Sequence, residues 1–103
     1  MNDVTDMDIR IVYVMVFPDG TDVPLDDCKD LRREIEDAIQ WLPYGRKCRI
    51  GNLVRPQFWL PKRNPRRRAL GHVLAYWVSR GELPLEFVDP WYVTNKRYQR
   101  RRS

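Results

Sequence analysis

NPRRRALGHVLAYWVSRGELPL, residues 64–85, sets the architecture we expect for the whole chain, because it predicts a long helix and the turn that follows it. Asn64 is a favourable N-cap residue, and Pro65 suits the first helical position. Gly81 predicts the end of the helix. Between them, apolar side chains recur at three- and four-residue spacing, which predicts a buried stripe. The stripe consists of Leu70, Val73, Leu74, Trp77 and Val78.

The opposite face of this helix is small and polar, and we expect it to be exposed. At about 100° per residue, four side chains lie opposite the buried stripe and one lies at its margin. The four are Arg68, His72, Ala75 and Ser79, and the fifth is Tyr76.

The residues after the helix predict a β-hairpin and a short tail. Residues 83–88 predict a strand, Asp89-Pro90 a turn, and residues 92–98 a returning strand. Residues 99–103 are rich in arginine and predict a basic C-terminal tail. The expected organisation is one domain over residues 1–98 followed by this tail.

The residues before the long helix predict another amphipathic helix and several short elements. Apolar residues at helical spacing predict a helix that begins with Asp26 or Asp27 as its N-cap and ends before Pro43-Tyr44-Gly45. Residues 47–50 predict a short extended piece and residues 51–54 a single helical turn, and the proline-bracketed residues 56–61 predict an ordered loop. The outward face of the amphipathic helix is mostly acidic and would repel a phosphate backbone: Asp30, Arg33, Glu34 and Asp37.

The N-terminal part of the chain predicts a strand. Residues 9–17 are dense in β-branched and aromatic side chains and stop at Pro18-Asp19-Gly20, which predicts a tight turn. Such continuous hydrophobicity favours burial on both faces, or one face on the core and the other on a partner. Ile11, Tyr13 and Met15 would then form a protein interface, and pairing with a second copy of the strand would give a homodimer.

From residue 27 onward the predicted elements are a helix, a short strand, a short helix, a longer helix and a two-stranded hairpin. Arg68-Ala69-Leu70-Gly71 opens the longer helix, residues 78–85 leave it, and Tyr98 would close the hairpin. In these features the chain resembles small winged-helix proteins of phages and mobile elements. The resemblance implies an α+β fold. Its winged-helix-like core would have two main helices, a short helix and a C-terminal β-hairpin wing, with an extra N-terminal strand. It also implies that the longer helix is a recognition helix for the major groove.

Charge is distributed unevenly along the chain, and this indicates a polyanionic partner. Residues 1–45 contain eleven Asp or Glu and four Lys or Arg, whereas residues 46–103 contain three and fifteen, so the net charges are −7 and +12. Duplex DNA is the partner we expect, because phosphates attract Lys and Arg through counterion release. An acidic protein partner and a self-paired surface are the alternatives. The candidate nucleic-acid contacts are Lys62, Arg63, Arg66, Arg67, Arg68, His72, Ser79, Lys96, Arg97, Arg100 and Arg101.

Two aromatic residues near the hairpin tip form a further candidate protein interface, or a contact made by the wing. These are Trp91 and Tyr92, which follow Pro90. Exposed aromatic side chains often anchor protein–protein contacts.

No catalytic or metal-binding pattern stands out in the sequence. His72 is the single histidine and has no nucleophile placed by a motif, and we expect neither a cofactor nor a metal site. Cys28 and Cys48 predict reduced, partly buried thiols, with a redox pair as the alternative. The acidic N-terminus and short apolar runs predict a cytosolic protein that does not enter a membrane.

Two hypotheses of function follow from these patterns. The first is a small non-catalytic DNA-binding protein, a transcriptional regulator or accessory factor that uses the helix and the C-terminal hairpin. The second is a phage-type inhibitor or adaptor that binds a nucleic-acid-processing enzyme. Its acidic face would then mimic DNA, or its aromatic and basic face would dock on a protein.

Overall fold

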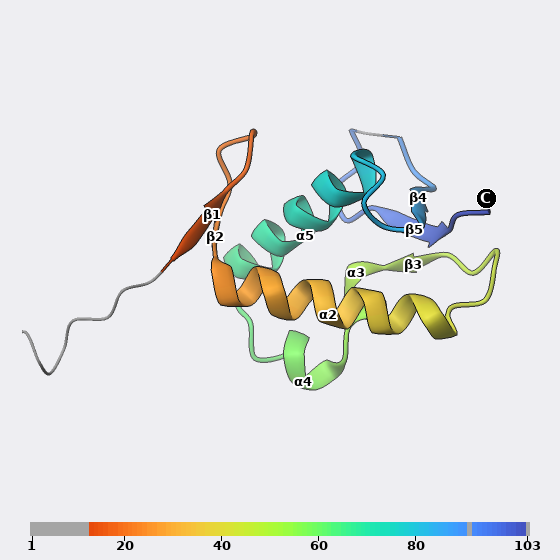
Figure 1. Ribbon diagram of the computed structural model, residues 1–103, viewed down its shortest axis with the longest axis horizontal. Helices are drawn as coiled ribbons and strands as arrows, with labels where there is room; N and C mark the ends of the chain where they lie inside the picture. The colour runs from red at the N-terminus through yellow and green to blue at the C-terminus, as the bar shows by residue number, and fades with distance from the viewer. Residues whose placement is uncertain (1–12, 91, 103) are drawn as a thin grey trace, which may run out of the picture.

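Helices α2 (Leu25–Trp41) and α5 (Asn64–Ser79) pack against each other and supply half of the buried residues in the hydrophobic core of the described part of the chain. The computed structural model describes residues 13–90 and 92–102, which form a mixed α+β fold (Figure 1). Within these residues the fold has four helices and two small antiparallel sheets. The α+β class expected from the sequence is therefore confirmed.

Both long helices bury the stripes that their sequences predict. All five stripe residues of α5 are buried, from Leu70 to Val78, and so are Leu31, Ile35 and Ile39 of α2. Burial of each such side chain contributes roughly 1.5 to 3 kcal/mol relative to exposure. The two helices thus hold the core without help from a large sheet.

The helix N-termini differ from expectation by one or two residues. Helix α2 begins at Leu25 after Pro24, so Asp26 and Asp27 lie in its first turn rather than at its N-cap. There their carboxylates lie near the positive end of the helix dipole. Helix α5 begins at Asn64, with Arg63 at the N-cap position and no side-chain cap.

The C-terminal hairpin belongs to a three-stranded sheet with the order β3-β5-β4. Strand β3 (Cys48–Arg49) and strand β4 (Leu85–Phe87) both pair antiparallel with β5 (Arg97–Arg100). The predicted hairpin is present. Its second strand, however, begins at Arg97 rather than at residue 92, and it continues to Arg100, past residue 99 where the tail was expected to begin. Hydrogen bonding continues past it, because the Arg101 amide donates to the Pro84 carbonyl over 2.9 Å.

The predicted N-terminal strand is a short strand in a separate two-stranded sheet. Strand β1 (Val14–Val16) pairs with β2 (Asp22–Pro24), and all three β1 residues are exposed. The expectation that this strand has a buried face is therefore wrong for its described part. Phe17 and Val23 anchor the hairpin to the core instead, and residues 9–12 lie outside the described part of the chain.

Two one-turn helices connect β3 to α5. These are α3 (Ile50–Leu53) and α4 (Pro56–Trp59). The turn at α3 is confirmed, whereas α4 occupies residues predicted to be a loop, because Pro56 is acceptable in a first helical turn. Gly51 is required here, because a Cβ at this position would lie 2.9 Å from Nε1 of Trp59.

A charged pair ties this connection to α2. The Glu34 carboxylate accepts hydrogen bonds from the Arg55 amide at 2.9 Å and from Arg55 Nη2 at 2.6 Å. Glu34 is buried, so its expected position on the outward acidic face is wrong. Hydrogen bonds from the Arg55 side chain hold the pKa of Glu34 below its usual value. No helix in the described residues is both long enough and apolar enough to span a bilayer.

Candidate nucleic-acid interface

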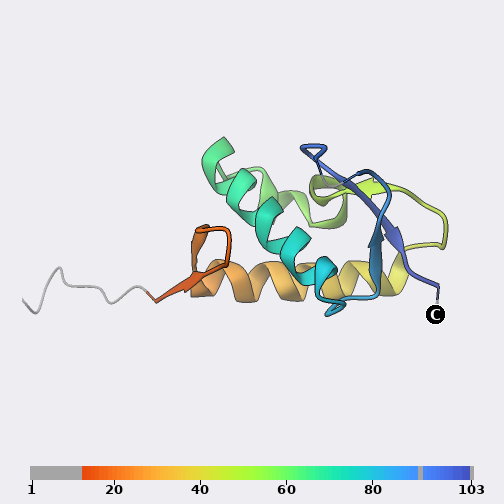
Figure 2. The ribbon, with the colours of Figure 1, turned by 90° about the horizontal axis from the view of Figure 1, so that it is seen from above.

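The exposed face of α5 forms one wall of a groove, and the start of α3 and the β4–β5 loop form the others. In Figures 1 and 2 the β1–β2 hairpin lies on one side of α5 and the β4–β5 hairpin on the other. The groove between α5, the start of α3 and the β4–β5 loop encloses about 790 Å³, and we call it the α5 groove. Its polar lining includes Arg49, Asn52, Asn64, Arg68, His72, Asn95 and Lys96.

Four of the predicted contact residues line this groove: Arg67, Arg68, His72 and Lys96. Arg68 and His72 come from α5 and Lys96 from the β4–β5 loop, which is far from them in the sequence. The Arg68 side chain is exposed and forms no ion pair or hydrogen bond with other described residues. Lys96 Nζ donates to the Val93 carbonyl at 2.8 Å, which holds the ammonium group near the groove.

His72 also faces the β1–β2 hairpin. Its Nδ1 lies 3.1 Å from Thr21 Oγ1 and 3.6 Å from Asp19 Oδ2. The Asp19 carboxylate accepts a hydrogen bond from the Thr21 amide, which lowers the pKa of Asp19 and keeps it ionised. This side of α5 is therefore partly acidic. Thr21 and Asp19 were not predicted as site residues.

A second hollow continues the basic surface toward the N-terminus of α5. It encloses about 790 Å³ and is lined by four of the predicted cations. Arg63 is exposed and unpaired among the described residues, whereas Arg66 forms an ion pair with Asp27 at 3.3 Å. Lys62 Nζ donates to the Phe58 carbonyl at 2.9 Å and lies over the Phe58 ring. The lining cations are Lys62, Arg63, Arg66 and Arg68.

The guanidinium group of Arg67 is used inside the protein. It donates to the carbonyl oxygens of Trp59 and Leu60 at 3.3 and 3.1 Å and lies over the Trp59 ring. These bonds satisfy carbonyl groups at the end of α4. We therefore assign Arg67 to holding α4 against α5.

Arg97 is likewise committed to an internal pair. Its guanidinium and its backbone amide both donate to the Asp89 carboxylate, at 2.6 Å from Nη2 and 2.9 Å from the amide. These hydrogen bonds lower the pKa of Asp89 to about 2. The pair closes the base of the β4–β5 loop, so Arg97 positions this loop.

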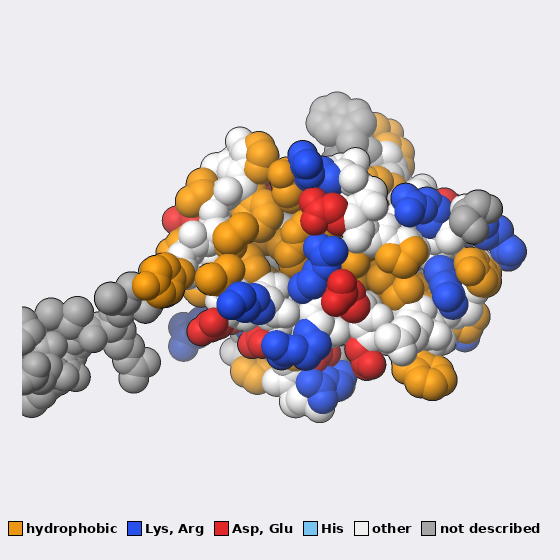
Figure 3. Space-filling view, in the orientation of Figure 1, with side chains coloured by type: hydrophobic (Ala, Val, Ile, Leu, Met, Phe, Trp, Pro, Cys, Tyr) orange, Lys and Arg blue, Asp and Glu red, His pale blue; other side chains and the backbone are white. Residues whose placement is uncertain are grey.

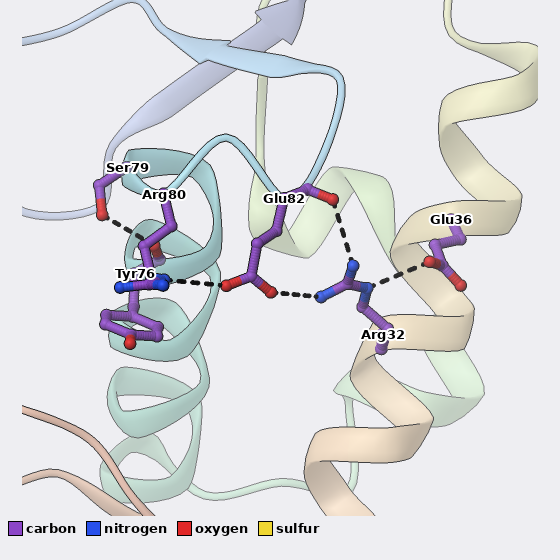
Figure 4. Close-up of polar contacts among 6 residues, drawn as sticks. All are labelled: Arg32, Glu36, Tyr76, Ser79, Arg80 and Glu82. Atoms are coloured by element: carbon purple, nitrogen blue, oxygen red, sulfur yellow. Dashed lines mark hydrogen bonds and ion pairs between the residues drawn. The ribbon is translucent and has the colours of Figure 1, made fainter.

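Ser79 lies on the exposed face, but its hydroxyl group turns back into the helix. Its Oγ donates to the Tyr76 carbonyl at 2.7 Å (Figure 4). Beside it, the Glu82 carboxylate lies between Arg80 and Arg32, with both ion pairs at 3.2 Å. This network ties the exit of α5 to α2 and leaves the C-terminal end of the α5 face with little free charge.

The remaining predicted residues lie away from the α5 groove. Arg100 donates to the Leu42 carbonyl at 3.2 Å and lies over Tyr44, while Arg101 is exposed near Gly81. Of the predicted protein interface, Tyr13, Met15 and Tyr92 are exposed, and Ile11 and Trp91 lie outside the described residues.

Several groove residues were not predicted as site residues. Arg49 donates from Nε to the Asn95 carbonyl at 3.2 Å, which joins the β4–β5 loop to the start of α3. Asn95 has a φ of 53°, a left-handed conformation that asparagine tolerates better than most residues. An asparagine within the second predicted strand, residues 92–98, was the available signal for this turn.

Comparison with protein families, with curated proteins and with solved structures finds no match to this chain. In the described residues, no group of three or more His, Cys, Asp or Glu side chains is arranged to hold a metal ion. The function of this chain is therefore inferred from the geometry and charge of the α5 groove.

Proposed function

We propose that this chain is a winged-helix-like protein that binds duplex DNA through α5, with the β4–β5 hairpin as its wing. The element order from α2 to β5 supports this proposal, since it matches the order that the resemblance implies except for the additional short helix α4. The sheet supports it further, because pairing with β3 returns the hairpin to the body and brings its loop beside the exposed face of α5.

The observation that carries the proposal is the meeting of Arg68, His72 and Lys96 in one groove. An arginine with no internal partner can donate two hydrogen bonds to guanine or bind a phosphate. An α-helix fits the major groove of B-DNA, and a lysine on the adjacent loop would contact the flanking phosphate backbone. The three side chains therefore match the two kinds of contact that duplex recognition needs.

The charge distribution defines the direction in which the backbone would run. Asp19 lies on the β1–β2 side of α5, 3.6 Å from His72, whereas Arg63 and Lys62 lie just before the N-terminal end of α5. Asp22 lines the hollow beside these two cations. Phosphates are repelled from the first side and attracted to the second. We therefore infer that the duplex backbone passes over the N-terminal half of α5 and the β4–β5 loop.

Acidic DNA mimicry receives less support from the surface. Four acidic residues of α2 form ion pairs with arginine side chains, which neutralise much of the acidic helix: Asp27, Asp30, Glu34 and Glu36. A DNA mimic needs unneutralised carboxylates at phosphate-like spacing. Binding to a protein partner in place of DNA is therefore an outcome of the test below rather than a second proposal.

The proposal is tested by fluorescence anisotropy of the protein with random-sequence duplex DNA between 50 and 200 mM salt. If about four phosphates are neutralised, affinity falls roughly 150-fold over this range. The double variant Arg68→Glu, His72→Ala is expected to weaken duplex binding by at least about tenfold, because it removes two groove contacts and adds a repulsive charge.

Lys29→Glu is the matched control for this variant. Lys29 is exposed on α2, does not line the α5 groove, and makes no ion pair within the described residues. Its substitution changes the net charge by the same amount as Arg68→Glu. Equal losses in the two variants would mean that net charge alone drives binding, and wild-type protein that binds no duplex at 50 mM salt would exclude the proposal.

A further inference from the structure

A second basic surface lies at the end of α2, outside the α5 groove. It consists of Trp41, Tyr44, Arg46, Lys47, Arg100 and Arg102, and we call it the Tyr44 patch. The segment after α2 is joined there to the C-terminal end of β5, because Arg100 Nη1 donates to the Leu42 carbonyl at 3.2 Å. The guanidinium carbons of Arg100 and Arg102 lie 4.6 and 4.8 Å from the Tyr44 ring centroid.

The cations of this patch have no acidic partner among the described residues. The side chains of Arg46 and Lys47 are exposed and make neither an ion pair nor a hydrogen bond there. The side chains of Arg100 and Arg102 contact only a carbonyl group and an aromatic ring. An aromatic face attracts a cation but leaves its charge in place. In Figure 3, Lys and Arg side chains gather among hydrophobic side chains at this end of the molecule.

Elsewhere on this face of the molecule, several arginine side chains are paired with carboxylates. Along the middle of the face in Figure 3, positive and negative side chains alternate, and arginines such as Arg32 and Arg80 are paired with glutamates. Free positive charge is therefore found at some parts of the surface, among them Arg63 and Arg68 beside α5 and the Tyr44 patch. Such a concentration of unpaired cations favours a polyanionic ligand.

The aromatic side chains narrow the choice of polyanion. The Trp41 side chain is 78% exposed, and Tyr44 is 48% exposed with its ring already contacted by guanidinium groups. Duplex DNA offers phosphates but keeps its base faces stacked, whereas a single strand offers both phosphates and free base faces. Aromatic faces beside a basic path are the combination that binds unpaired bases.

We propose that the Tyr44 patch binds single-stranded nucleic acid, with a base stacked on Trp41 and phosphates contacting Arg46 and Lys47. None of the patch residues lines the α5 groove, as far as the described residues show. The proposal therefore goes beyond duplex binding by α5 and predicts a ligand with both paired and unpaired segments, such as a duplex with a single-stranded overhang.

The test is anisotropy with a labelled 20-nucleotide single strand and with a blunt duplex, using Trp41→Ala and the control Trp41→Phe. Loss of one stacked base should weaken single-strand binding roughly 5- to 100-fold in Trp41→Ala. Trp41→Phe should retain most of the affinity because it keeps an aromatic face. Blunt-duplex binding should be unchanged in both variants, since Trp41 does not line the α5 groove.

A second variant, Arg46→Ala with Lys47→Ala, tests the phosphate contacts independently of the aromatic ring. The slope of log affinity against log salt should fall by about 1.4 for the single strand. Single-strand affinity that is unchanged in both variants would overturn the proposal while leaving duplex binding by α5 intact. Polyglutamate that binds equally well, with the same dependence on Trp41, would also overturn it and would assign the patch to an acidic protein.

Discussion

The two hairpins beside α5 have similar positions but are held by different forces. The β1–β2 hairpin is attached through apolar side chains, Phe17 and Val23, and its β1 strand is exposed. The β4–β5 hairpin belongs to a three-stranded sheet, and its loop is closed by the Asp89–Arg97 pair. One side of α5 is therefore bordered by a hairpin that is held by packing and the other by a hairpin that is held by ionised groups, so the two hairpins can be perturbed separately.

Removing the apolar anchor should produce the largest effect. Phe17 is buried and its ring packs edge-on against Tyr76 at a centroid distance of 5.2 Å. We expect Phe17→Ala to lower the free energy of unfolding by about 3 kcal/mol, the low end for such truncations, because the adjoining exposed hairpin can relax. Urea unfolding followed by circular dichroism measures this loss.

Tyr13→Ala is the control within the same hairpin. The Tyr13 side chain is 67% exposed, so its truncation should change stability by no more than about 0.5 kcal/mol. Equal losses for the two variants would contradict the view that Phe17 is the anchor.

Removing the Asp89 carboxylate, which pairs with Arg97 in the β4–β5 hairpin, should have a smaller and pH-dependent effect on stability. The Asp89 carboxylate is held ionised by Arg97, and its pKa falls from the usual 3.8 to about 2. Because the pKa is lower in the folded state, this stabilisation is present above about pH 4 and is lost as pH falls toward 2. Asp89→Asn should therefore lower the thermal midpoint at pH 6, and the difference from wild type should shrink between pH 4 and 2.

The exposed Asp22→Asn serves as the control for this pH profile, since the Asp22 side chain has no ion pair or hydrogen bond among the described residues. Its midpoint should follow that of the wild type across the range. A constant difference between wild type and Asp89→Asn at every pH would indicate that the carboxylate acts through shape rather than charge.

The smallest expected effect concerns the turn of the N-terminal hairpin. Gly20 has a φ of 87° and open space around it, so Gly20→Ala should cost about 1 kcal/mol from backbone strain alone. Gly71 lies in α5 with no heavy atom close to an added Cβ. Gly71→Ala should therefore stabilise by up to about 1 kcal/mol. Thermal unfolding of the two variants measures these opposite signs, and equal signs would contradict the assignment.

The long helices could be predicted from sequence because their burial follows a local period. Leu70 to Val78 are spaced so that one face must be apolar, and the structure buries that face. The short elements depend on distant residues and could not be placed as well. Strand β5 extends to Arg100 because β3 and β4 pair with it, and nothing within residues 97–100 indicates that extent.

The candidate site could be predicted as a surface but not residue by residue. Arg66, Arg67 and Arg68 are adjacent and chemically identical in the sequence, yet they face Asp27, the carbonyl groups of Trp59 and Leu60, and open solvent, respectively. Which arginine keeps a free charge is decided by tertiary neighbours. Composition alone therefore overstates the charge available to a ligand at this helix.

The strand order of the C-terminal sheet has a consequence for synthesis on the ribosome. Strand β5 is the central strand, and β3 and β4 pair with it rather than with each other. Among the described elements β5 comes last in chain order. Strand β3 is therefore synthesised before β5, its partner in the described sheet, and α3, α4, α5 and β4 are made between them. The helices and the β1–β2 hairpin can pack against their partners earlier. We therefore expect the β3-β5-β4 sheet to form late, when β5 pairs with the two strands made before it.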